Sequence, residues 1–77
     1  MTPGKLYTYS SPRGVYSDYK CISRIEDLKF NEPFLFLGEK VELKWVQSYK
    51  ILTSKGIVGW IQVGYPESIK VFGEANG

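Results

Sequence analysis

Short stretches of alternating apolar and polar residues recur along the chain, and no segment repeats apolar residues at helical spacing over three turns. In KLYTY (5–9), Tyr7 and Tyr9 share one face of an extended strand, and Leu6 lies on the other. FLFL (34–37) is apolar at every position, which predicts a strand packed on both faces. Several such segments separated by turn residues predict an all-β domain, a small barrel or sandwich.

Turn-forming residues divide these strands. Residues 10–18 contain Pro, Gly, three Ser and Asp, which predicts a loop or an irregular hairpin before a short strand at 19–25. Between Val41 and Thr53 a long strand is expected, with a bulge or break at Val46–Gln47, where the apolar parity shifts. The other expected elements are a break at 38–40, a hairpin turn at 54–56, a strand at 57–62, a single 3₁₀ turn within 64–68 and a strand at 69–72.

A chain of 77 residues has room for one hydrophobic core. We expect a barrel over 5–72, with a flexible start at 1–4 and a loose tail at 73–77. Hydrophobic residues make up 43% of the chain, including two Trp, six Tyr and four Phe. Such a short chain has little apolar surface to spare, so any ring left in contact with water calls for an explanation.

Charge and residue types exclude several classes of function. Ten Lys and Arg face eight Asp and Glu, and the basic residues are scattered, whereas a nucleic-acid binder normally shows a basic stripe. The chain has no histidine, so we expect neither a zinc site nor an activated nucleophile at Cys21, which is expected to be a small buried residue. We therefore expect a protein without cofactor and without enzymatic activity. A lone cysteine, the lack of a secretion signal and the lack of a long apolar run predict a soluble cytoplasmic protein that does not bind membranes.

Four segments together resemble the SH3 family, in the same order along the chain. KLYTY (5–9) resembles the family's Ala-Leu-Tyr-Asp-Tyr segment, and DLKF (27–30) resembles its diverging turn. Trp45 stands where the family carries a ligand-facing Trp, and GIVGWIQVGY (56–65) is similar to its Gly-x-x-Gly-aromatic-Ile-Pro-x-Asn-Tyr stretch. NEPFLFLG and GIVGWI also resemble the bacterial SH3-like family. The resemblance implies a five-stranded SH3-like barrel with a long first loop and one 3₁₀ turn before the last strand.

The resemblance also implies a ligand site. In the family, the aromatic residues of these segments form one shallow groove that binds an extended peptide. Gln62 stands where the family has a proline between the aromatic residues. Gly56 would allow the hairpin to turn, and Gly59 would leave room where another backbone passes close. The first loop carries Arg13, Lys20 and Arg24 against Asp18 and so lacks the acidic character that pairs with basic proline-rich ligands. The expected groove residues are Tyr7, Tyr9, Trp45, Trp60, Gln62 and Tyr65.

Three functions remain open on these grounds. The first is a non-enzymatic module that binds a protein or an extended peptide through the groove. The second is a structural or assembly protein, for example viral or phage, that uses the barrel edge for contacts between copies. The third is binding to cell-wall peptides, as in bacterial SH3-like domains. The sequence leaves the ligand and the oligomeric state undetermined.

Overall fold

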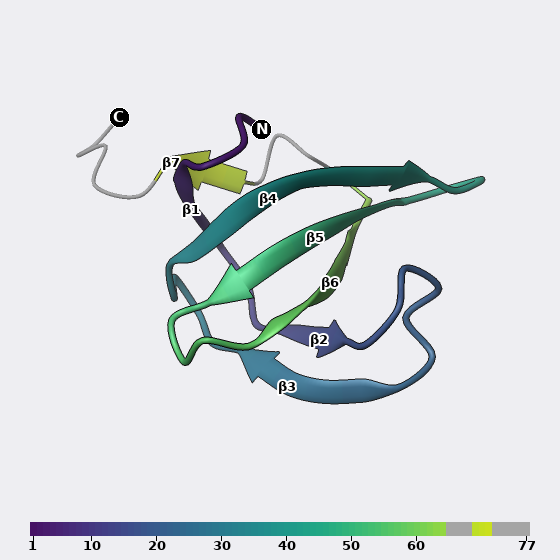
Figure 1. Cartoon of the computed structure of the whole chain (residues 1–77), viewed down its shortest axis with the longest axis horizontal. Coiled ribbons are helices and arrows are strands. Elements are labelled where there is room, and N and C mark those ends of the chain that lie inside the picture. The colour runs from purple at the N-terminus through teal and green to yellow at the C-terminus, as the bar shows by residue number, and fades with distance from the viewer. Residues whose placement is uncertain (65–68, 72–77) are drawn as a thin grey trace.

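The structure is a computed structural model that describes residues 1–64 and 69–71. Within them the chain is all-β and forms one antiparallel sheet that curls into a half-barrel (Figure 1). The strands are β1 (Leu6–Tyr9), β2 (Arg13–Tyr16), β3 (Arg24–Leu28), β4 (Phe34–Glu42), β5 (Gln47–Thr53), β6 (Val58–Val63) and β7 (Ile69–Val71). Their order across the sheet is β3-β2-β6-β5-β4-β1-β7. The described residues thus form seven strands, where the sequence predicts five.

The two additional strands are β2 and β3, which form a hairpin inside the predicted long first loop. The sequence placed a loop at 10–18 and a strand at 19–25, whereas strands form at Arg13–Tyr16 and Arg24–Leu28. Val15, with no exposed surface, is the only fully buried side chain of β2. A single buried position between Gly14 and Tyr16 is too short to be read as alternation. The pairing also shifts register between Val15 and Tyr16, which further obscures the pattern.

Strand β4 buries one face rather than two. Phe34 and Phe36 are 1% and 4% exposed, but Leu35 is half-buried and Leu37 is 38% exposed. The predicted break at 38–40 is instead a bulge inside the strand. There Gly38 adopts a φ of 100°, and the pairing with β5 shifts register between Phe36 and Lys40.

The long strand predicted between Val41 and Thr53 is not formed, because β4 ends at Glu42 and β5 begins at Gln47; where a bulge or break was predicted at Val46–Gln47, the chain turns back in the β4–β5 hairpin. The Leu43 amide donates to the Val46 carbonyl at 2.9 Å, and Lys44 and Trp45 form the loop between them. The ribbon of this hairpin extends well beyond the rest of the sheet (Figure 1). Within the tip region, residues 43–46, Lys44 and Trp45 are exposed, whereas Leu43 and Val46 are half-buried.

Alternating residues of the strands fill the inside of the curl. The fully buried side chains include Val15, Leu28, Phe34, Ile51, Ile61 and Val63. The N-terminal residues, predicted to be flexible, hydrogen-bond to the sheet: the Gly4 amide donates to the Phe36 carbonyl at 2.9 Å. The strand predicted at 69–72 is confirmed at Ile69–Val71, whereas the 3₁₀ turn within 64–68 and the tail at 73–77 lie outside the described residues, apart from Gly64.

Both glycines of the GIVG segment have the roles expected of them. Gly56 has a φ of 82° and its amide donates to the Thr53 carbonyl at 3.0 Å, closing the β5–β6 turn. A Cβ atom added to Gly59 would lie 2.4 Å from Val15 Cγ1 and 2.9 Å from the Tyr16 carbonyl oxygen. Gly59 is therefore the point where β2 crosses closely over β6.

Candidate functional site

The two tyrosines of β1 lie in the core. Tyr7 and Tyr9 are 6% and 3% exposed. Each hydroxyl accepts a hydrogen bond, that of Tyr7 from the Thr2 amide at 2.5 Å and that of Tyr9 from Arg13 Nη2 at 2.7 Å. The Arg13 guanidinium also stacks over the Tyr9 ring at 4.6 Å. Neither ring is open to a ligand, which corrects the expectation that both belong to an exposed groove.

Trp60 is on the outer face of the sheet, where it is half-buried. It pairs with Lys50 across β5, and Gln62 follows two residues later on the same side, opposite Ser48. Tyr19, from the loop between β2 and β3, packs edge-on against the Trp60 ring with the ring centres 6.1 Å apart. We call the outer surface formed by Tyr19, Lys50, Trp60 and Gln62 the Trp60 face.

A hydrogen bond fixes the loop that supplies Tyr19. Ser48 is fully buried although it lies on the outer side of β5, because the loop covers it. Its Oγ donates to the Tyr19 carbonyl at 2.5 Å. A second bond, from the Ser17 amide to the Ser23 carbonyl at 2.9 Å, closes the base of the loop. The Tyr19–Trp60 pair is thus held in place before any ligand arrives.

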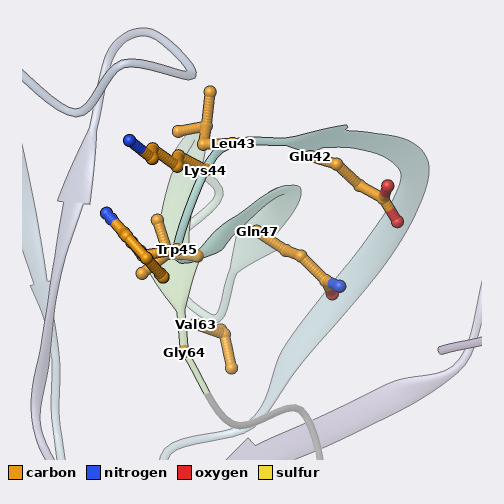
Figure 2. A pocket seen from close by; sticks show the side chains of 8 residues that line it. Glu42, Leu43, Lys44, Trp45, Gln47, Val63 and Gly64 are labelled. Atoms are coloured by element: carbon orange, nitrogen blue, oxygen red, sulfur yellow. The ribbon is translucent and has the colours of Figure 1, made fainter.

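Trp45 is the most exposed of the large apolar side chains in the described residues, at 80%. It is part of the hairpin tip, and the Lys44 ammonium lies 5.4 Å from the centre of its ring. The tip borders a hollow of about 200 Å³ whose other walls come from β4, β5 and the end of β6, including Glu42, Gln47 and Val63. Figure 2 shows the Trp45 and Lys44 side chains on one side of the hairpin and those of Glu42 and Gln47 on the other.

The expected groove residues are therefore distributed over three places. Tyr7 and Tyr9 are interior, Trp60 and Gln62 share the outer face, and Trp45 stands at the hairpin tip. Tyr65 lies outside the described residues. The described members of this set therefore do not form one groove. Sequence reasoning also missed Tyr19, because its segment of mixed turn residues carries no period that would place its ring on β6.

Two ionisable groups near these surfaces have pKa values shifted by their surroundings. Burial raises the pKa of the Cys21 thiol, a shift that the Ser48 hydroxyl opposes and Asp18 adds to, so the thiol is a poorer nucleophile than a free cysteine. The sequence predicts that Cys21 is a small buried residue. In the structure it is half-buried in the loop, where its φ is 58°. Burial likewise raises the pKa of Tyr49, whose hydroxyl donates to Gln47 Oε1. What these surfaces offer is aromatic contact area and a few hydrogen-bonding groups.

Other features bear on possible ligands. Across residues 1–64 and 69–71, no three His, Cys, Asp or Glu side chains gather as a metal site would require. The described part of the chain also contains no helix long and apolar enough to span a membrane. No family model matches the chain, and neither a curated protein nor a solved structure was found that resembles it.

Proposed function

We propose that the chain is a non-enzymatic binding module with an SH3-like barrel, and that it contacts a partner protein or extended peptide through the Trp60 face and Trp45. One observation carries the proposal: two tryptophans and Tyr19 retain exposed ring surface in a domain with little apolar area to spare. Exposed Trp and Tyr side chains are the residue types that most often dominate binding energy at protein interfaces.

The order of the strands supports an SH3-like barrel. Removing the β2–β3 hairpin leaves five strands, β1 and β4 to β7, and three of the segments that resemble the family lie within or between them: KLYTY includes β1, Trp45 lies between β4 and β5, and GIVGWIQVGY includes β6. β1 pairs with both β4 and β7, and β4, β5 and β6 follow one another as neighbours. The hairpin then takes the place of the long first loop and carries Tyr19 at its end.

The Trp60 face suits an extended polypeptide. Its ring surfaces offer apolar contact, and the half-buried amide of Gln62 can both donate and accept hydrogen bonds. The Lys50 ammonium is paired with Glu39 Oε1 at 2.8 Å, so the surface carries little net charge. Trp45 stands at the tip of the β4–β5 hairpin, three residues before Ser48 of β5. A ligand that covers both tryptophans would have to run along β5, and an extended chain has that reach.

A peptide selected from a displayed random library tests the proposal. Titrating it into labelled protein should shift the amide signals of Tyr19, Trp60 and Gln62 and the indole signal of Trp45. Replacing Trp60 by Ala should weaken binding by at least roughly 30-fold, which corresponds to a hot spot of about 2 kcal/mol. Phe30→Ala is the matched control, since Phe30 is an aromatic residue, 61% exposed, in a different turn. A selection without binders, or shifts that avoid these residues, would contradict the proposal.

A further inference from the structure

The exposed ring of Trp45 lies on the same side of the β4–β5 hairpin as the Trp60 face. Successive side chains of a strand point to opposite sides, so Gln47 points away from the outer side of β5, which Ser48 faces. Figure 2 shows the Lys44 and Trp45 side chains on the side of the hairpin opposite to Gln47. They therefore lie on the side of Ser48, and one surface runs from the hairpin tip to the Trp60 face.

Lys44 brings a positive charge to the hairpin tip. Its ammonium lies 5.4 Å from the centre of the Trp45 ring, close enough for a cation–π contact, and both side chains are exposed. In Figure 2 the ammonium nitrogen and the ring nitrogen of Trp45 lie on the same side of the hairpin. A ligand acceptor bound to the ammonium would bring the neighbouring part of the ligand onto the ring.

The carboxylates of β4 leave this ammonium without a partner. Glu42, the acidic residue nearest to Lys44 in the sequence, points to the other side of the hairpin and lies 3.5 Å from the Lys40 ammonium. Glu39 is paired with Lys50 at 2.8 Å. In the part of the chain that the structure describes, no carboxylate lies within 4.0 Å of the Lys44 ammonium.

The loop between β2 and β3 does not supply the missing negative charge. Its one carboxylate, that of Asp18, accepts a hydrogen bond from the Ile22 amide at 3.3 Å, and the exposed Lys20 follows two residues later. The loop is therefore neutral as a whole, whereas the hairpin tip carries a positive charge. A ligand that is electrostatically complementary to this surface has a negative group at the tip.

We propose that the partner polypeptide is acidic, and that one of its Asp or Glu side chains pairs with Lys44 while an adjoining apolar residue covers Trp45. This inference rests on the proposed function, since it names the chemistry of the polypeptide that the Trp60 face and Trp45 bind. A side-chain carboxylate fits better than a free C-terminus. Backbone N–H groups usually hold a C-terminal carboxylate, and the Leu43 amide at the tip already donates to the Val46 carbonyl at 2.9 Å.

The spacing along β5 predicts where the acidic residue stands in the ligand. Lys50, which pairs with Trp60 across the sheet, follows Lys44 by six residues. Six residues of extended chain span about 20 Å, and the turn at the tip shortens the distance. An extended ligand that runs along β5 therefore has its acidic residue at most about six positions from the residue that covers Trp60.

The distribution of charge favours a peptide over a nucleic acid. Aromatic rings and positive charge also suit single-stranded nucleic acid, but such ligands follow a groove lined by many cations. Four basic side chains of the described residues are instead paired with carboxylates: Arg24, Lys40, Lys50 and Lys55. One uncompensated ammonium beside a ring matches a single carboxylate.

Selection from two displayed peptide libraries tests the proposal. Both contain random peptides of about fifteen residues, long enough to pass both tryptophans, and only the first encodes Asp and Glu. Each peptide is fused through its C-terminus, so that only side chains supply carboxylates. Binders from the first library should share an acidic residue. Changing it to the matching amide should weaken binding to the wild type roughly three- to fivefold, as expected of one exposed ion pair.

The variant Lys44→Gln identifies the partner of that carboxylate. It should weaken binding of the acidic peptide by the same factor and leave binding of the amide peptide unchanged, and added salt should weaken only the wild-type complex with the acidic peptide. Lys5→Gln is the matched control: it removes the same charge from an exposed lysine before β1 and should bind like the wild type.

Each other outcome has a definite meaning. Binders that contact Trp60 but carry no shared acidic residue, or that respond equally to the amide change in the wild type and in Lys44→Gln, would overturn this inference and leave the proposed function standing. Two libraries without binders would contradict the proposed function and this inference with it. A single-stranded oligothymidylate that binds more tightly than the acidic peptide, and that loses affinity with Lys44→Gln, would assign the ammonium to a nucleic-acid ligand instead.

Discussion

Leu6 and Tyr7 are neighbours on β1 and face opposite sides of the sheet. The leucine is 43% exposed, whereas the tyrosine, which carries a polar hydroxyl, is 6% exposed. The inner side of the curl encloses Tyr7 against Phe34, with ring centres 6.3 Å apart, while the described residues on the outer side leave Leu6 partly open. The difference shows that the direction of sheet curvature, more than the polarity of the side chain, decides which side of a strand is buried in so small a domain.

The tyrosines can occupy the inner side because their hydroxyls have partners. The Thr2 amide donates to Tyr7, and Arg13 donates to Tyr9. A buried hydroxyl without a partner would be destabilising by about 1–3 kcal/mol, enough to matter in a domain of this size. The N-terminal segment and β2 therefore contribute to the core by pairing polar groups as well as by covering apolar ones.

The largest effect on stability should come from truncating Tyr7, whose side chain faces the inner side of the sheet. Tyr7→Ala should lower the free energy of unfolding by about 3–5 kcal/mol, because it leaves a cavity and removes a hydrogen bond. Leu6→Ala should lower it by less than about 1 kcal/mol, because the side chain is already partly in water. Urea unfolding of both variants measures the difference. Equal losses of unfolding free energy in the two variants would contradict the assignment of Tyr7 to the core and of Leu6 to the solvent-exposed side.

Adding a methyl group to the inner side should have the next largest effect. Gly59→Ala would place a Cβ 2.4 Å from Val15 Cγ1 and 2.9 Å from the Tyr16 carbonyl oxygen. We expect a loss of about 1–3 kcal/mol in unfolding free energy, since the backbone of β2 must move. Gly64→Ala is the control, because among the described residues the nearest atom to the added carbon is Val46 Cγ1, at 3.8 Å. Thermal unfolding of the two variants should differ by several degrees.

Much of this division between the faces follows from the sequence. The alternation in KLYTY correctly predicts that Tyr7 and Tyr9 share a face, and the two glycines of GIVG have the predicted roles. Alternation alone does not say which face of the sheet becomes the inner one, so it predicts the shared face of the two tyrosines but not that this face belongs to the core. The continuous apolar run FLFL likewise gives no sign that Leu37 lies outside.

The part of the candidate site that the sequence does not predict depends on contacts between segments far apart in the chain. Tyr19 packs against Trp60 in a loop that Ser48, 29 residues further along, holds by its hydroxyl. No local pattern in the sequence encodes such a contact. The strands, by contrast, rest on period-two spacing within a few residues, which is why their positions could be predicted more closely than the surface they build.

Removing the Ser48 hydroxyl should have a moderate effect that is specific to the outer face. Ser48→Ala leaves the Tyr19 carbonyl without its partner and should lower the free energy of unfolding by about 1 kcal/mol. Because the loop is then less constrained, the Trp60 indole should become more accessible to a fluorescence quencher, with Trp45→Phe as the background so that one tryptophan reports. Ser10→Ala, at an exposed residue after β1, should change neither quantity. Loss of stability without increased quenching would separate Ser48 from the Tyr19–Trp60 pair.

The smallest effect concerns Glu32, in the turn between β3 and β4, which belongs to neither face. The Ser54 hydroxyl, which donates to Glu32 Oε2 at 2.7 Å, and the Lys29 amide, which donates to Oε1 at 2.9 Å, hold the pKa of this carboxyl below its ordinary value of 4.5. A carboxyl with a lowered pKa in the folded state contributes stability that is fully present above pH 4.5 and is lost as the pH falls below that value.

Glu32→Gln should therefore be slightly less stable than the wild type at pH 7. The difference in unfolding free energy between the two proteins should narrow below pH 4.5, as the wild-type carboxylate becomes protonated. Because the side chain is still partly exposed to solvent, the difference in unfolding free energy should stay within the range of a surface interaction, under about 1 kcal/mol. Urea midpoints of both proteins from pH 7 to pH 3 measure it, and Ser54→Ala should reproduce part of the change by removing the main hydrogen bond. A gap that is constant across this range would show that the carboxylate charge, and with it the turn, has no part in the pH dependence of folding.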